Sequence, residues 1–167
     1  LVKPLSKDTS SLDGFEPLIG ILDEYHESKD NKMMEVLESG QIQLTSPLTI
    51  IISTAGFYLN GPMYKEYGYL KRILLNGELN DNYFTFIAEQ DSEEEVHDAS
   101  MWIKSNPLLE VEAQRDTIEK NLRKRLDEGL QKNDLAKKLV KNFNLWQNAG
   151  SDGYIKHTDW LACKTEE

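Results

Sequence analysis

The sequence predicts an α/β fold, in which an incomplete parallel sheet with flanking helices is followed by a small helical subdomain. Two short apolar runs, residues 17–23 and 47–53, lack polar alternation, which is typical of strands in a buried parallel sheet. The segment between them, residues 31–40, has apolar residues at helical spacing, so we expect a right-handed strand–helix–strand unit. Amphipathic segments in the second half of the chain predict the helical subdomain.

The first predicted strand ends in two carboxylates. Residues 17–22 read Pro-Leu-Ile-Gly-Ile-Leu, and Asp23 and Glu24 follow directly. Such a run predicts a strand buried on both faces, and open α/β sheets hold ligands at the carboxyl ends of their strands. This is the pattern of a Walker B motif in a P-loop NTPase, where the first acid holds a Mg²⁺ shell and the second orients an attacking water. The alternative is that the acids cap the next helix.

The second predicted strand ends in hydroxyl side chains. Residues 47–52 are short and β-branched, and the segment 53–56 reads Ser-Thr-Ala-Gly. The helix between the strands should end at Gly40 as its C-cap. Because both strands of such a unit end at one sheet edge, Ser53 and Thr54 should lie beside the two carboxylates, where they can sense a bound phosphate or water. Taken alone, they could instead form a turn or an N-cap.

The remaining elements follow from periodicity and turn residues. We expect a helix from Pro62 to about residue 76, a third strand over residues 83–88, a short helix over residues 98–104, and helices over residues 114–129 and 133–143. Gly129 should end the longest of these helices. The Arg123-Lys124-Arg125 run fits a solvated helix face, and Trp102, Trp146 and Trp160 fit packing anchors.

The composition limits the function classes. The chain has 167 residues, enough for one domain with a core, and a formal net charge of −10, which disfavours this segment as a primary duplex-binding surface. Its one cysteine, Cys163, leaves no internal disulfide and indicates a reducing compartment. No apolar run approaches the length of a membrane span, so we expect no membrane partner. No G-x-x-x-x-G-K-S/T phosphate loop occurs in the sequence.

Several short motifs occur in the order and at the spacing of one known family. They are Leu12-Asp13-Gly14, Ile-Leu-Asp-Glu-Tyr-His at 21–26, Ile-Ile-Ser-Thr-Ala-Gly at 51–56, Trp102-Ile103-Lys104 with Asn106-Pro107, and Phe-Asn-Leu-Trp at 143–146. By these motifs the sequence resembles the large terminase subunit of tailed bacteriophages over nearly the whole chain. The Asp-Glu pair is common to many NTPases, and the later Asn-Pro and Asn-Leu-Trp signatures make the resemblance specific.

The resemblance implies a part in the ATP-driven motor that packages viral DNA. Large terminases join an N-terminal P-loop ATPase domain to a C-terminal ribonuclease-H-like nuclease domain. By resemblance, Asp23 is the Walker B acid that binds Mg²⁺ through water, and Glu24 is the catalytic carboxylate. Ser53, Thr54 and Ala55 are then the coupling motif, which contacts the nucleotide and relays ATP hydrolysis to DNA translocation. Mg²⁺ and ATP as substrate are therefore expected.

The resemblance also implies partners and a setting. Double-stranded viral DNA, the portal protein and the small terminase subunit are the expected partners of the full-length protein. The expected setting is the cytoplasm of an infected or lysogenic bacterial host, with the procapsid portal as the place of action during packaging. A bare sheet edge would also favour self-association, so a homo-oligomer is expected.

The resemblance further divides the chain. Residues 1–97 correspond to the C-terminal half of the ATPase core, 98–146 to a helical linker or lid subdomain, and 147–167 to a connector toward a nuclease domain that is not present. The phosphate loop should lie upstream of Leu1 and the nuclease carboxylates downstream of Glu167. We therefore expect the isolated chain to hydrolyse ATP poorly and not to cut DNA.

Two other functions stay open at this point. The order Asp-Glu-x-His, followed by a strand ending in Ser53 and Thr54, also resembles the D-E-x-H box and S-A-T motif of superfamily-two helicases, although the order here is Ser-Thr-Ala. A non-enzymatic interaction module derived from a motor domain would suit the acidic charge and the missing phosphate loop. His26 lacks the second histidine of an H-E-x-x-H metal motif, so we predict a loop or helix-start histidine that contacts the coupling motif.

Overall fold

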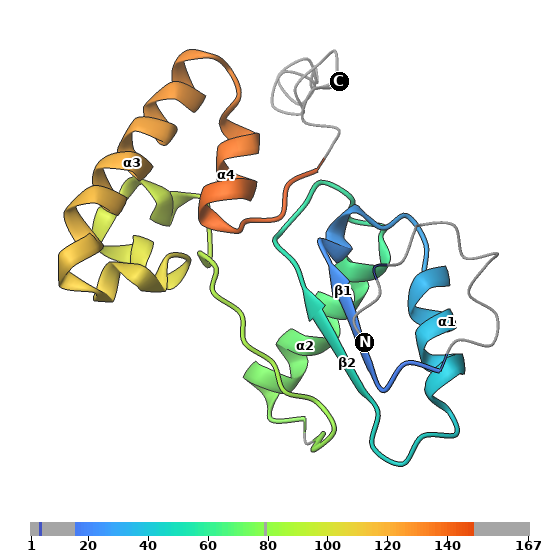
Figure 1. Cartoon of the computed structure of the whole chain (residues 1–167). Helices are drawn as coiled ribbons and strands as arrows, with labels where there is room; N and C mark the ends of the chain where they lie inside the picture. Colours follow the sequence, from blue (N-terminus) through green and yellow to red (C-terminus); the bar gives the residue numbers. More distant parts are fainter. Residues whose placement is uncertain (1–3, 5–15, 79, 149–167) are drawn as a thin grey trace, which may run out of the picture. The chain divides into compact units, whose positions relative to one another are not determined.

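The computed structural model describes residue 4, residues 16–78 and residues 80–148 (Figure 1). The chain forms two compact units. The first contains the described residues up to Thr54 together with Asn60–Asn80, and the second contains Ala55–Leu59 and the described residues from Asp81 onward. The motif at residues 12–14, the single cysteine and the predicted connector beyond residue 148 lie outside the described residues.

The first unit is built around a two-stranded parallel sheet. Strand β1 (Ile19–Asp23) pairs with strand β2 (Leu48–Ile52), and helix α1 (Lys32–Gln41) joins them. In the register of the pair, Asp23 lies opposite Ile52. The predicted strand–helix–strand unit is therefore confirmed, and the polar segments that follow the strands leave the sheet at one edge.

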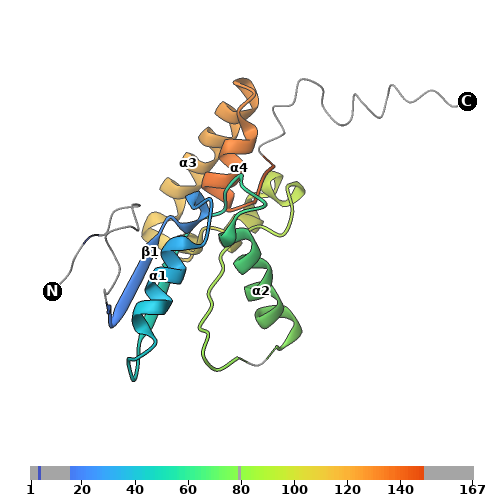
Figure 2. The same cartoon turned by 90° about the vertical axis from the view of Figure 1, so that its right-hand side faces the viewer.

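Helix α1 covers one face of this sheet and lies alongside β1 in both views (Figures 1 and 2). The core of the first unit consists of Leu22, Tyr25 and Leu37, with Met33, Met34, Ile51 and Met63 packed against it. Gly20 of β1 faces the helix closely, because an added Cβ would lie 3.0 Å from a methyl group of Leu37.

The other face of β1 is open in the described part of the chain. Ile19 and Ile21 are 54% and 60% exposed, whereas Leu22 is 7% exposed. The prediction of a strand buried on both faces is therefore wrong here. Successive side chains of a strand point to opposite faces, and in the described residues of the first unit only the α1 side receives a covering layer.

The end of α1 differs from the prediction. The helix continues through Gly40 to Gln41, so Gly40 is not its C-cap. The reason lies in the side chain of Gln41, which is buried against β2. Its Nε2 donates to the Leu48 carbonyl at 3.3 Å, and its Oε1 accepts from the Thr49 hydroxyl at 3.0 Å. These hydrogen bonds stabilise the helical conformation of one further residue, Gln41, after the glycine.

Helix α2 (Pro62–Asn76) begins and ends as predicted. Pro62 stands in its first turn, where no intrahelical N–H is needed. Gly77 follows the last helical residue with φ of 67°, the left-handed conformation that glycine adopts without steric cost.

The second unit is helical. Helix α3 (Glu112–Gln131) is followed by α4 (Leu135–Phe143), which returns along it (Figures 1 and 2). Three short 3-10 helices precede them, at Glu94–His97, Ala99–Lys104 and Pro107–Glu110. The helices predicted in this half of the chain are confirmed, with the short one over residues 98–104 in 3-10 form. No helix in the described residues is long and apolar enough to cross a membrane.

Trp102 and Phe143 lie at the centre of the second unit. Their side chains are 1% and 0% exposed, and the rings meet edge to face with centroids 5.7 Å apart. The indole N–H of Trp102 donates to the Val96 carbonyl at 2.8 Å. The surrounding core residues are Leu109, Leu122, Leu126 and Leu139. Trp102 is thus confirmed as a packing anchor, whereas Trp160 lies outside the described residues.

Two predictions for this unit are wrong. Residues 83–88 belong to no sheet, and Phe84 and Phe86 are 94% and 74% exposed. Their composition suits a strand, but a strand also needs a partner to pair with. Gly129 does not end α3, because it lies inside the helix where α4 packs. An added Cβ there would lie 2.7 Å from the Lys138 Cγ, so the glycine permits close helix packing.

Candidate functional site

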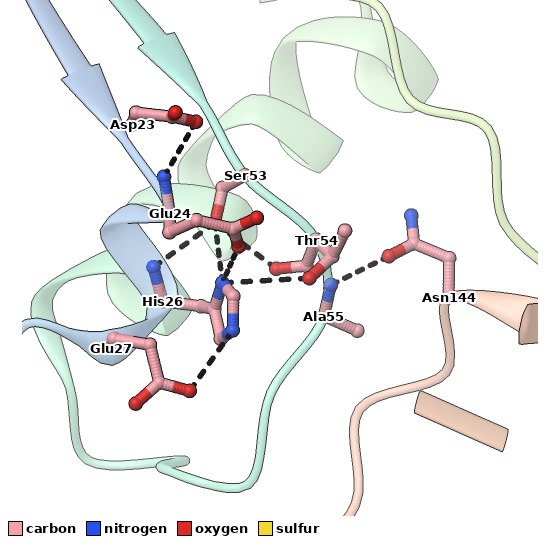
Figure 3. Close-up of polar contacts among 8 residues, drawn as sticks. All are labelled: Asp23, Glu24, His26, Glu27, Ser53, Thr54, Ala55 and Asn144. Carbon is pink, nitrogen blue, oxygen red and sulfur yellow. Dashed lines mark hydrogen bonds and ion pairs between the residues drawn. The ribbon is translucent and has the colours of Figure 1, made fainter. Parts of the chain in front are cut away.

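The edge of the sheet brings four of the predicted site residues together (Figure 3). Asp23 is the last residue of β1 and Glu24 follows it, while Ser53 and Thr54 follow β2 directly. The parallel register places Asp23 opposite Ile52, one residue before Ser53. The prediction that both polar segments share one edge is confirmed, and the chemical roles assigned to these residues stay predictions.

Asp23 presents a carboxylate to solvent. Its Oδ1 accepts a hydrogen bond from the Glu24 backbone N–H at 3.0 Å. In the described residues no group of three or more acidic, histidine or cysteine side chains could hold a metal ion. A single exposed carboxylate suits Mg²⁺, which keeps several waters and binds through one or two carboxylates and substrate phosphates. The donor set therefore fits a magnesium ion that arrives with a nucleotide.

Glu24 has a left-handed backbone conformation, with φ of 51° and ψ of 43°. For a residue with a Cβ this conformation costs about 1–2 kcal/mol relative to the right-handed region. It turns the chain from the end of β1 into the 3-10 helix Tyr25–Glu27 and directs the carboxylate toward His26 (Figure 3). Strained residues of this kind concentrate at functional sites, and no feature of the sequence signals this one.

The imidazole of His26 lies between two carboxylates. Its Nδ1 is 3.2 Å from the Glu24 Oε2, and its Nε2 is 3.2 Å from the Glu27 Oε1. The His26 side chain is 12% exposed, whereas the two carboxylates are mostly exposed. These two contacts are ion pairs only when the imidazole is protonated.

His26 also contacts the segment after β2. The backbone N–H of His26 donates to the Ser53 Oγ at 3.0 Å, and its Nδ1 lies 3.2 Å from the same oxygen. The Ser53 hydroxyl in turn donates to the Thr54 carbonyl at 3.1 Å, and the Thr54 Oγ1 lies 3.5 Å from the imidazole. The predicted contact between His26 and the Ser53–Thr54 segment is confirmed. Through it, Glu24 is linked to that segment by one side chain.

Tyr25 anchors this loop in the core of the first unit. Its side chain is 3% exposed, and its hydroxyl donates to the Asn31 Oδ1 at 3.0 Å. Burial, followed by the negative charges of nearby carboxylates, that of Glu66 first, raises the pKa of Tyr25 to about 12. The hydroxyl therefore stays protonated across the physiological pH range. The buried Tyr25 side chain thus fixes the position of its neighbours, Glu24 and His26.

Ala55 belongs to the second unit, unlike the two residues before it. It is 2% exposed, and its backbone N–H donates to the Asn144 Oδ1 at 2.6 Å (Figure 3). The predicted coupling motif is thus divided between the two units at the Thr54–Ala55 peptide bond. The role of Asn144 as a partner of this motif is absent from the sequence prediction, because nothing local to either residue indicates it.

Comparison with known protein families identifies the chain. The family model described as "Terminase large subunit, endonuclease domain" matches residues 78–167, which is more than half of the chain. The chain belongs to the terminase large subunit family. A second model, "Terminase large subunit, ATPase domain", matches residues 1–72. This assignment favours the packaging-motor interpretation over the helicase alternative.

Two further comparisons agree with the terminase assignment. Protein YmfN of Escherichia coli (strain K12) is 26% identical over 152 residues, which are 91% of this chain and 32% of that protein. The crystal structure of the HK97 bacteriophage large terminase matches with a TM-score of 0.62 at 17% identity, over 86% of this chain and 29% of that one. The chain therefore shares its fold with a phage large terminase and spans about a third of the length of these relatives.

The endonuclease match differs from one expectation. It begins at residue 78, so the terminase endonuclease region reaches into residues that we assigned to the ATPase core, the helical subdomain and the connector. The expectation that the nuclease domain lies wholly beyond residue 167 does not agree with this match. The division of the chain at residues 97 and 146, and the absence of a nuclease site, stay predictions.

The later terminase signature residues have structural roles in the second unit. Lys104 bridges Asp91 and Glu95 at 2.6 and 2.5 Å, and these two partners raise its pKa. The Asn106 Nδ2 donates to the Asn142 carbonyl near the end of α4 at 3.0 Å. Lys104 thus ties the 3-10 helix Ala99–Lys104 to the segment before it, and Asn106 bonds the residues after this 3-10 helix to α4.

Proposed function

We propose that this chain supplies the ATP-handling carboxylates and the coupling segment of a terminase large subunit, the motor that packages viral DNA. The observation that carries the proposal is the path of polar side-chain contacts from Glu24 through His26 to Ser53, at the edge where both parallel strands end. A motor needs such a path, because the group that handles the attacking water must be connected to the segment that moves.

Each residue has a defined task in this proposal. Asp23 would hold, through water, the Mg²⁺ that accompanies ATP as substrate. Glu24 accepts a hydrogen bond from the attacking water and orients it toward the γ-phosphate. Its carboxylate is 62% exposed, so a bound nucleotide can reach it. Because the same carboxylate also contacts His26, engagement of a water changes the partners of the imidazole, and Ser53 shares that imidazole.

The proposal extends to the full-length protein, since the relatives are about three times longer than this chain. Double-stranded viral DNA, the portal protein and the small terminase subunit are its proposed partners. The proposed place of action is the cytoplasm of an infected or lysogenic bacterium, at the portal of the procapsid. Within the chain, residues 1–97 supply the second half of the ATPase core and residues 98–146 a linker or lid.

Steady-state ATPase measurements on the full-length protein test this function. Glu24→Gln preserves the shape of the side chain and removes its charge, so we expect kcat to fall by about 100-fold or more. Glu27→Gln is the matched control, because Glu27 contacts the other nitrogen of the same imidazole. It should change kcat by less than about threefold. Equal losses in the two variants would argue against a special role for Glu24.

The isolated chain provides a second test. We expect it to hydrolyse ATP poorly, because the sequence contains no phosphate loop. Magnesium-dependent turnover by the chain that disappears in Glu24→Gln would contradict this expectation. If the full-length wild-type protein lacks ATPase activity as well, the non-enzymatic interaction module becomes the better interpretation.

A further inference from the structure

The side chain of Asn144 joins two distant backbone segments within the second unit. Its Oδ1 accepts from the Ala55 N–H at 2.6 Å, and its Nδ2 donates to the Ala88 carbonyl at 2.9 Å. Asn144 directly follows α4 and has φ of 54°, a left-handed conformation that asparagine tolerates better than most residues. The residue therefore ends a helix and clamps two chain segments at once.

Backbone hydrogen bonds on both sides of Asn144 reinforce this junction. The Gln90 N–H donates to the Phe143 carbonyl at 3.2 Å, and the Gln147 N–H donates to the Gly56 carbonyl at 3.1 Å. The last carbonyls of a helix have no intrahelical partner, so the bond to Phe143 also satisfies the end of α4. Residues 143–147 are thus bonded to residues 55–56 and 88–90.

Ala55 is the position where this clamp bears on the candidate site. The residue is 2% exposed, and its buried N–H donates to the Asn144 Oδ1, a bond that is costly to break away from water. The preceding residues, Ser53 and Thr54, carry the hydroxyls that contact His26. A displacement of Thr54 along the chain therefore strains the hydrogen bond between the Ala55 N–H and the Asn144 Oδ1.

We propose that Asn144 is a positioning residue that fixes the backbone directly after Thr54 to the end of α4, so that a change at Ser53–Thr54 is transmitted to the helical unit. This rests on the proposed ATPase function of the site. Asparagine suits the task because one amide supplies an acceptor to one segment and a donor to the other, while its backbone closes the helix.

Three variants separate the clamp from an ordinary helix cap. Asn144→Gly keeps the left-handed backbone and removes both side-chain bonds. Asn144→Asp keeps the acceptor for Ala55 and removes the donor to Ala88. Leu139→Val is the control for lost stability, because it removes buried apolar volume from α4, where Leu139 is 3% exposed, and keeps the backbone carbonyl that accepts from the Asn144 and Leu145 N–H groups.

Hydrogen exchange followed by mass spectrometry on the full-length protein gives the first readout. In the peptide that spans residues 54–59, Asn144→Gly should raise the exchange rate about tenfold. Asn144→Asp should retain most of the protection, and Leu139→Val should not affect this peptide selectively. Unchanged exchange in Asn144→Gly would overturn the proposal, as would equal exchange in the Gly and Asp variants.

The second readout is the number of base pairs packaged per ATP hydrolysed. We expect Asn144→Gly to lower this ratio by about fivefold while ATP turnover stays within about twofold, with Asn144→Asp in between and Leu139→Val unchanged. A proportional loss of both activities would mean a structural role and overturn the proposal. Absence of ATP turnover in the wild-type protein would overturn the proposed function and the transmission role, and the exchange experiment would still decide the anchoring.

Discussion

The Nδ1 of His26 lies 3.2 Å from the Glu24 Oε2, and Glu24 reaches this position only in a left-handed backbone conformation. Glu24, the candidate catalytic residue, therefore makes this contact at the cost of an unfavourable backbone conformation. The folded state maintains the cost because Tyr25, the next residue, is buried in the core and bonded to Asn31. Activity and stability should therefore be in conflict at residue 24.

Glycine at residue 24 should make the isolated chain more stable than alanine does. Glycine adopts the left-handed conformation without a Cβ clash, so Glu24→Gly should exceed Glu24→Ala in free energy of unfolding by about 0.5–1 kcal/mol. Urea denaturation monitored by circular dichroism measures this difference. The alanine variant is the control, since it loses the same carboxylate and keeps the strain. Equal stabilities would show that residue 24 carries no strain.

The carboxyl group of Glu66 predicts a pH-dependent stability. Burial, and then the charge of Glu38, raise its pKa above the usual range of a glutamate. A carboxyl with a raised pKa in the folded state adds stability at low pH, and the addition is lost as the pH rises through the folded-state value. Glu66→Gln should therefore be more stable than wild type at pH 7, by about 0.5 kcal/mol, and this gain should vanish below about pH 4.

Thermal unfolding from pH 3 to pH 8 tests the Glu66 prediction. Glu38→Gln should give a smaller gain at pH 7, because burial of Glu66, the larger cause, remains in that variant. If Glu66→Gln gains the same stability over wild type at pH 3 and pH 7, ionisation of Glu66 is not the cause of the gain.

Two helical glycines provide a matched pair. A Cβ at Gly129 would lie 2.7 Å from the Lys138 Cγ and 3.2 Å from the Leu135 backbone, whereas a Cβ at Gly68 in α2 meets nothing within 4 Å. Gly129→Ala should destabilise the chain by about 1–3 kcal/mol through overpacking. Gly68→Ala should stabilise it by about 1 kcal/mol through helix propensity. Chemical denaturation of both variants should show opposite signs, and equal signs would refute the close approach of α3 and α4.

The open face of β1 predicts self-association of the isolated chain. Ile19 and Ile21 are more than half exposed on this face, and Leu48 and Ile52 at the ends of β2 are exposed by 50% and 55%. Apolar surface of this extent favours association. Ile21→Lys should shift the chain toward the monomer in light scattering, without loss of stability, because Ile21 makes little buried contact. Wild-type chain that is monomeric at about 100 μM would count against the prediction.

Local patterns predicted most of the fold. The strands, the helix between them and the helices of the second unit follow from apolar spacing and from turn residues such as Gly77. The parallel pairing followed from the helix predicted between the two strands, and it placed Asp23 and Ser53 at one edge. This part of the site was predictable because both halves depend on the position of a strand end.

The features that escaped prediction depend on contacts between distant residues. Gly40 and Gly129 suggest helix ends in the sequence. The buried side chain of Gln41 instead extends α1 past Gly40, and Gly129 lies inside α3 where α4 packs closely. Residues 83–88 resemble a strand, and pairing decides whether a strand forms. Asn144 has partners 89 and 56 residues away, so no local pattern indicates its bonds. No local sequence pattern indicates the left-handed backbone conformation of Glu24 either.

The division of the chain has a practical consequence for anyone who wishes to study the units separately. The polypeptide passes from one unit to the other three times, after Thr54, after Leu59 and after Asn80. A gene fragment that starts at Asp81 would omit the strip 55–59, and with it the Ala55 and Gly56 groups that bond to Asn144 and Gln147. Simple truncation therefore leaves the helical unit incomplete, and separate expression would require the strip to be supplied by a designed fusion.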